Sequence, residues 1–138
     1  MESESLIAWK DEYSVGVKEI DDQHKQLFVI INQLVEAIKT IPREDEIANI
    51  ISKIVEYKIV HFATEEKYFH LFGFEGTDEH EEAHRAFNAK LIETQTAFKG
   101  DTMGFAFAAA DFLEDWLIVH LMTMDQKYKQ CFREHGLV

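Results

Sequence analysis

The chain has 138 residues, of which 46% are hydrophobic and 12% aromatic, with 11 Phe against a single Pro and 6 Gly. A domain usually holds about 100–150 residues, so the length predicts one domain over residues 1–138, and the composition excludes disordered, collagen-like and low-complexity chains. The 26 acidic and 14 basic residues give a formal charge of −12, which excludes non-specific nucleic-acid binding because that binding requires clustered Lys and Arg.

Residues 1–17 precede the first helical pattern and are expected to form an N-terminal arm. Apolar side chains along it favour packing of the arm on the rest of the chain: Trp9, Tyr13, Val15 and Val17. The first five residues lack the basic and apolar regions of a signal peptide. No apolar run approaches the roughly 18 residues that span a bilayer, and the single Cys131 cannot form an internal disulfide. We therefore expect a cytoplasmic protein that makes no contact with a membrane.

Four segments carry apolar residues at spacings of three and four, which predicts helices over residues 18–40, 43–72, 77–99 and 102–134. Pro42 ends the first, because the residue before a proline disfavours the helical conformation. Gly73 ends the second and Gly100 the third, and Asp101 or Thr102 caps the fourth. No segment alternates like a strand. The pattern predicts an all-α, antiparallel up-down-up-down four-helix bundle with the N-terminal arm packed on it.

Histidines lie on the apolar face of every predicted helix. At about 100° per residue, His24 lies within the apolar stripe of the first helix, between Ile20 and Leu27. The other three helices contribute further histidines and one carboxylate to the same side as their apolar residues: His61 and Glu65, His80 and His84, and His120. Five imidazoles and a carboxylate are therefore predicted to meet in the core.

Any one of these histidines alone is explained by a hydrogen bond to a neighbour in an ordinary core. Five together are different, because each unpaired buried polar group costs about 1–3 kcal/mol. A metal ion removes that cost, and neutral imidazole with carboxylate suits Fe, Zn or Cu. The pattern therefore favours a metal site over a purely structural bundle.

Asp125 follows His120 by five residues, which on a regular helix places it about 140° away. A regular helix would also turn Lys127 toward the core. One extra inserted residue would instead bring Asp125, Tyr128 and Phe132 onto the core side. We therefore predict a π-type bulge between His120 and Asp125, a feature often found at functional sites.

Taken together, these residues resemble the hemerythrin family, specifically its bacterial single-domain members. The resemblance covers most of the chain and is carried by these motifs: Trp9 with Ser14-Val15-Gly16-Val17, Ile20-Asp21-x-Gln23-His24, His61-Phe62-x-x-Glu65-Glu66, His80-x-x-x-His84-x-x-Phe87 and Trp116-Leu117-x-x-His120-x-x-x-x-Asp125. It implies a bundle around two non-haem Fe ions joined by an oxo or hydroxo bridge. It further implies that one iron is held by His80, His84 and His120. The other iron is held by His24 and His61, and the Glu65 and Asp125 carboxylates lie between the two.

The resemblance implies reversible O₂ binding at the iron with fewer ligands, for oxygen carriage, storage or delivery, with NO or small anions as other ligands. Sensing of O₂, redox state or NO, or detoxification at the same site, is the alternative. A ferritin-like site built on Glu81-x-x-His84 would leave three of the histidines unexplained. The imidazole-rich donor set favours binding over turnover, so we do not expect an enzyme.

Phe62, Trp116 and Leu117 flank the expected ligands and are candidate walls of an O₂ pocket, with Leu117 nearest the gas. Ordinary core packing explains the same three residues equally well. Lys58 lies near the apolar side of its helix, and we expect its charged end to reach the edge of the bundle. The alternative is a position in the site, where Lys58 would affect the access of anions. The net charge favours solubility over self-association, so we expect a monomer.

Overall fold

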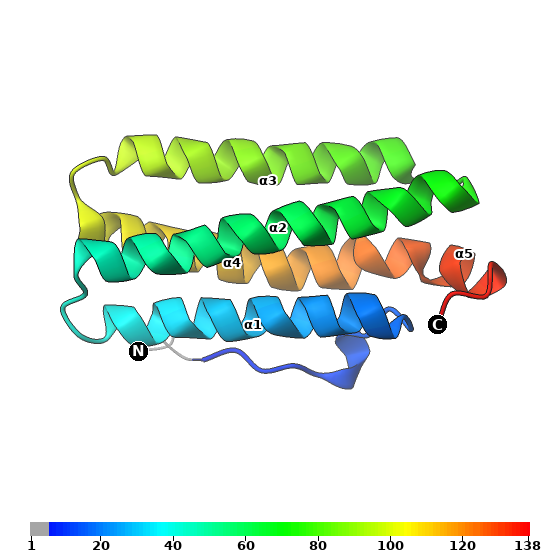
Figure 1. Cartoon of the computed structure of the whole chain (residues 1–138), viewed down its shortest axis with the longest axis horizontal. Coiled ribbons are helices and arrows are strands. Elements are labelled where there is room, and N and C mark those ends of the chain that lie inside the picture. Colours follow the sequence, from blue (N-terminus) through cyan, green and yellow to red (C-terminus); the bar gives the residue numbers. More distant parts are fainter. Residues whose placement is uncertain (1–5) are drawn as a thin grey trace.

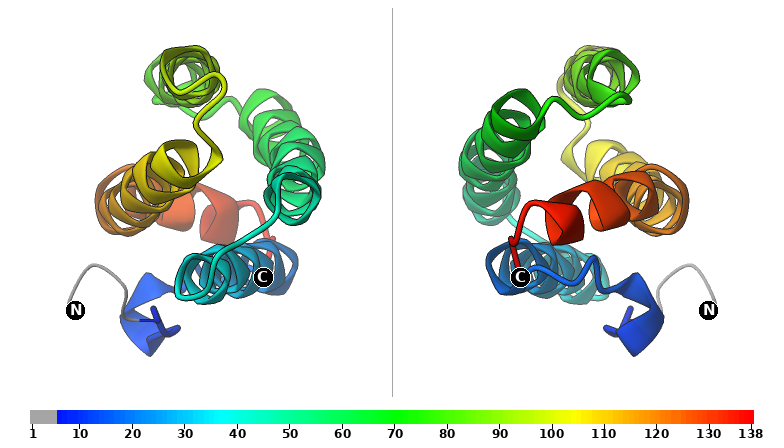
Figure 2. Two further views of the ribbon diagram at one scale, coloured as in Figure 1. Left: turned by 90° about the vertical axis from the view of Figure 1, so that its left-hand side faces the viewer. Right: turned by 90° about the vertical axis from the view of Figure 1, so that its right-hand side faces the viewer.

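The computed structural model describes residues 6–138 as helices joined by short connections, with no strand among these residues. Four long helices run antiparallel, each returning beside the last (Figure 1): α1 (Lys18–Ile38), α2 (Glu44–Phe72), α3 (Thr77–Ala97) and α4 (Thr102–Thr123). Viewed along their length, they surround a common axis (Figure 2). The predicted all-α four-helix bundle is confirmed.

The helices form because their apolar residues fall on one side and are buried there. In α1, Ile20, Leu27, Ile31 and Leu34 are at most 2% exposed. The Asp101 side chain caps α4 by accepting a hydrogen bond from the Gly104 amide at 2.9 Å, as the sequence predicted. None of the helices within residues 6–138 has the length and apolar character that a membrane-spanning segment requires.

The arm runs along α1 and includes a short 3₁₀ turn, η2 (Asp11–Tyr13). The Asn32 side chain exchanges two hydrogen bonds with the backbone of Ile7, at 2.8 and 2.9 Å. Asp21 accepts hydrogen bonds from the Ser14 hydroxyl at 2.6 Å and the Val15 amide at 2.9 Å. The packing expected for the arm is observed for residues 6–17, and its first five residues lie outside the described part of the chain.

The end of α4 differs from the sequence-based expectation. The predicted helix over residues 102–134 is broken: α4 ends at Thr123, a 3₁₀ turn η3 (Asp125–Tyr128) follows, and α5 (Lys129–Glu134) crosses the end of the bundle (Figures 1 and 2). The backbone irregularity after His120 is thus a 3₁₀ turn, and the predicted π bulge was wrong. Its predicted consequence is confirmed, because Asp125, Tyr128 and Phe132 are all fully buried.

Candidate metal centre

The seven predicted ligands meet in the middle of the bundle. They come from all four long helices and from η3, and each is at most 5% exposed: His24, His61, Glu65, His80, His84, His120 and Asp125. We call these seven residues the cage. Helical spacing brings them together, because residues four apart, such as His80 and His84, lie on the same face of a helix.

The cage divides into two overlapping groups of donors. Within each group the candidate ligand atoms all lie within 4.8 Å of one another: Glu65, His80, His84 and His120 in the first, and His24, His61, Glu65 and Asp125 in the second. Glu65 belongs to both groups. Its Oε1 atom lies 3.0 Å from His84 Nε2 and 3.4 Å from His61 Nε2. The first group therefore has three imidazoles and the second has two.

Asp125 also lies between the groups, because its two oxygen atoms face opposite ways. Oδ1 is 2.9 Å from His120 Nε2 and 3.1 Å from His80 Nε2. Oδ2 is 3.0 Å from His24 Nε2. Two carboxylates thus lie between two sets of imidazoles, an arrangement suited to a pair of cations.

The polar contacts inside the cage fit metal ions better than hydrogen bonds. His24 Nε2 and His61 Nε2 are 3.1 Å apart, and His80 Nε2 and His120 Nε2 are 3.2 Å apart. Each pair of neutral imidazoles can share at most one proton, so that one nitrogen donates and the other accepts. Neither Asp125 oxygen has a partner with hydrogen-bond geometry among the described residues. A cation in each group would give these lone pairs a common acceptor.

The electrostatics of the cage also favour cations. Burial opposes ionisation of Asp125, but His120 and His24 lower its pKa well below the usual range. The pKa of Glu65 is likewise lowered, because His61 and then His80 outweigh its burial. Burial lowers the pKa of His61 to about 3, whereas Asp125 and Glu65 outweigh burial and raise the pKa of His80 to about 9. Both carboxylates therefore keep their negative charge in the interior.

Three groups outside the cage hold its members in place. Gln23 Oε1 accepts a hydrogen bond from His61 Nδ1 at 2.7 Å, and Glu66 Oε2 accepts one from His84 Nδ1 at 2.9 Å. The Tyr128 hydroxyl donates to Glu65 Oε2 at 2.6 Å. Such contacts set the orientation and tautomer of metal ligands. Gln23 and Glu66 appear in the sequence motifs beside His24 and Glu65, but no role was predicted for them.

An apolar layer lies on each side of the cage. Because neighbouring helices run in opposite directions, one turn forward in α1 and α3 reaches the same level as one turn back in α2 and α4. One turn from the cage toward the α1–α2 connection therefore lies the Tyr57 layer: Leu27, Tyr57, Phe87 and Leu117. On the opposite side lies the Tyr128 layer: Ile20, Phe69, Tyr128 and Phe132. The two layers belong to separate apolar clusters, so the cage interrupts the core.

The candidate pocket walls contact the cage directly. The Phe62 ring stacks on His84 at 3.8 Å with an angle of 8°, and Trp116 stacks on His120 at 4.2 Å with an angle of 14°. Leu117 is 1% exposed and lies in the Tyr57 layer. Their part in gas binding stays a prediction. Lys58 lines a surface groove between α2 and α3 that also includes Phe62 and His84.

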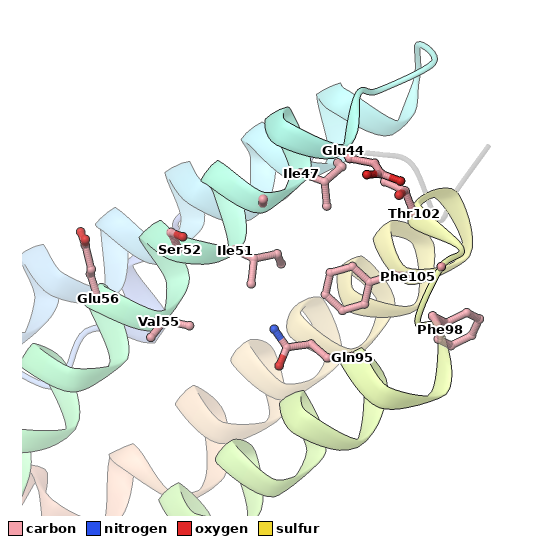
Figure 3. A pocket seen from close by; sticks show the side chains of 12 residues that line it. Glu44, Ile47, Ile51, Ser52, Val55, Glu56, Gln95, Phe98, Thr102 and Phe105 are labelled. Atoms are coloured by element: carbon pink, nitrogen blue, oxygen red, sulfur yellow. The ribbon is translucent and has the colours of Figure 1, made fainter.

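A larger groove lies at the end of the bundle near the α1–α2 and α3–α4 connections (Figure 3). It has a volume of about 740 Å³ and an apolar lining that includes Ile47, Ile51 and Phe105. None of the seven cage residues lines it. The groove is therefore separate from the metal centre.

Comparisons with known proteins agree with this geometry. A family model described as the hemerythrin HHE cation binding domain matches residues 15–132. A bacteriohemerythrin of Clostridium acetobutylicum is 29% identical over 127 residues, covering 89% of this chain and 98% of that protein. A hemerythrin-like protein of Naegleria gruberi is 29% identical over 121 residues, covering 88% and 89%. A crystal structure of a leucine-to-phenylalanine mutant is 25% identical, with a TM-score of 0.82 over 91% of this chain and 96% of that one.

Proposed function

The chain belongs to the hemerythrin family, and we propose that it binds O₂ reversibly at a di-iron centre, for carriage, storage or delivery of the gas. The observation that carries this proposal is the cage, whose two donor groups share Glu65. In the proposal, His80, His84 and His120 would hold one iron, and His24 and His61 would hold the other. The Glu65 and Asp125 carboxylates, together with an oxo or hydroxo group, would bridge the two.

The irons would supply the electrons and the open coordination position that binding of O₂ requires. The protein supplies neutral imidazoles in fixed orientations, because hydrogen bonds at Nδ1 lock the rings of His61 and His84. It also supplies a shielded environment, because each cage residue is at most 5% exposed and an apolar layer lies on each side. NO and small anions would occupy the same position as O₂.

The donor set supports binding rather than catalytic turnover. Five imidazoles and two carboxylates donate less negative charge than the carboxylate-rich sets of di-iron oxygenases. High-valent iron is therefore disfavoured. We propose a binding protein that acts as a monomer in the cytoplasm, and its acidic surface limits self-association.

An absorption spectrum of the reduced protein, taken before and after exposure to air and with iron counted per chain, tests the proposal. We expect about two irons per chain and new visible bands that disappear when O₂ is removed under vacuum. Rapid irreversible oxidation would instead support sensing or detoxification, and a protein that binds no iron would be a purely structural bundle.

His61→Ala provides a sharper test of the assignment. It removes one of the two imidazoles of the second donor group and leaves the three of the first. We expect iron to fall toward one per chain and the O₂ adduct to be lost. An adduct that persists in this variant would contradict the proposed position of the gas.

A further inference from the structure

One buried hydroxyl beside the cage has no role in the fold. The Tyr57 Oη atom is buried and has no hydrogen-bond partner among the described residues. Such groups are rare in folded proteins, because an unpaired buried donor loses its bonds to water without replacing them. Tyr128, on the other side of the cage, shows the usual arrangement, since its hydroxyl donates to Glu65.

The Tyr57 hydroxyl is buried although the residue as a whole is not. Tyr57 is one of the residues that line a surface groove between α1 and α2, with Gln23 and Ile30, and its oxygen is buried. The phenol ring stacks on the His61 ring, with 5.3 Å between centroids and 20° between planes. Tyr57 precedes His61 by one helical turn, so the two side chains lie one above the other on α2.

The surroundings of the hydroxyl leave it as a donor in an apolar space. The other members of the Tyr57 layer are hydrocarbon, and each is at most 3% exposed: Leu27, Phe87 and Leu117. A phenol is an O–H donor at neutral pH, so the Tyr57 hydroxyl can donate a hydrogen bond.

The donor group beside Tyr57 has fewer protein donors once Asp125, whose Oδ1 faces His80 and His120, is counted in both groups. It contains two imidazoles, those of His24 and His61, whereas the other group contains three. We infer that the Tyr57 hydroxyl donates a hydrogen bond to a small exogenous ligand, a diatomic gas or a small anion with an exposed acceptor atom, bound at the metal position of His24 and His61. The inference rests on the proposed function and adds the residue that holds the ligand.

This role explains why the hydroxyl is left without a partner. A tyrosine held by another side chain, like Tyr128, has no donor to offer. An apolar layer without Tyr57 would hold a ligand through the metal alone. The unpartnered hydroxyl thus lowers the stability of the ligand-free protein and strengthens binding of the ligand.

Azide titration of the oxidised, iron-loaded protein tests the inference, with azide affinity measured from the change in the visible spectrum. Tyr57→Phe removes only the hydroxyl and should weaken azide binding about tenfold, because hydrogen bonds to charged groups are the stronger ones. Tyr13→Phe is the matched control. Tyr13 is a buried tyrosine that packs on Trp9 and Phe28 in the arm, and its variant should bind azide like the parent.

Thermal unfolding of the metal-free proteins gives a second, independent readout. Because Tyr57 Oη has no partner, Tyr57→Phe should melt at the same temperature as the parent or higher. A lower melting temperature would reveal a structural partner of the hydroxyl and overturn the inference, as would unchanged azide affinity in an iron-loaded Tyr57→Phe variant. A parent protein that binds neither iron nor azide would instead overturn the proposed function.

Discussion

The Tyr57 layer and the Tyr128 layer flank the same cage, and each contains one tyrosine, yet the two tyrosines differ in their hydrogen bonds. Tyr128 donates to Glu65 at 2.6 Å, whereas the Tyr57 hydroxyl has no partner among the described residues. The Tyr128 layer is completed by α5 and is bonded to the cage. The Tyr57 layer packs on the cage with its one donor free. One side of the cage thus contributes a hydrogen bond to a candidate ligand, and the other presents a hydroxyl that is free to act as a donor in the ligand binding that we propose.

The largest expected effect comes from removing the group that both donor sets share. Glu65→Ala takes away the carboxylate that lies within 3.5 Å of His61, His80 and His84, and it also leaves Tyr128 without its acceptor. We expect iron to fall below two per chain and the visible bands of the paired irons to disappear. Iron analysis with the absorption spectrum measures this, and a variant that keeps two coupled irons would disprove the shared role of Glu65.

A pair of cavity-forming variants tests the difference between the layers directly. Leu117→Ala should destabilise the protein by about 2–5 kcal/mol and Phe132→Ala by about 3–5 kcal/mol, as measured by chemical denaturation. Only Leu117→Ala opens space beside the expected ligand position, so it alone should speed the release of O₂ and the oxidation of the iron. Equal changes in both variants would show that the two sides of the cage are equivalent.

Tyr128→Phe sharpens the comparison between the tyrosines. It removes a donor from a buried carboxylate, which should cost about 1.5–3 kcal/mol of unfolding free energy in the metal-free protein. Because the fold lowers the pKa of Glu65, this cost should be complete above pH 4.5, the ordinary value for glutamate, and should fade as the pH drops below it. A variant as stable as the parent at neutral pH would contradict the role of this hydrogen bond.

The smallest effect is expected from Glu66→Gln, at the edge of the cage. The Glu66 carboxylate accepts a hydrogen bond from His84 but is 35% exposed. The side-chain amide of the introduced glutamine should therefore replace part of this interaction. We expect iron affinity to fall by up to about tenfold, with O₂ binding retained. Competition with a chelator measures this affinity, and Glu82→Gln on the exposed face of α3 serves as the control.

Much of this architecture could be predicted from the sequence, because helical periodicity places side chains on faces. The spacing of His80 and His84 predicted a shared face, and the unusual position of Asp125 predicted an irregular backbone. The type of irregularity was wrong, since periodicity shows only that a regular helix fails and not whether a π bulge or a 3₁₀ turn replaces it. The order of the seven donors, rather than any single pair, gave the site its specificity.

Contacts between residues on different helices could not be predicted from the sequence. Glu66 and His84 lie on different helices, and nothing in either segment shows that they meet. Tyr128 was predicted to turn toward the core, and its hydrogen bond to Glu65 depends on how η3 turns. The missing partner of Tyr57 is likewise visible only once all its neighbours are in place.

The 3₁₀ turn that follows Met124 carries a consequence for biosynthesis. Asp125, which stands between the two donor groups, is the last of the seven donors to be made as the chain grows from its N-terminus. Neither metal position of the proposed centre is therefore complete until residue 125 has been synthesised. Iron would be captured there only after that point, when all four long helices have been made.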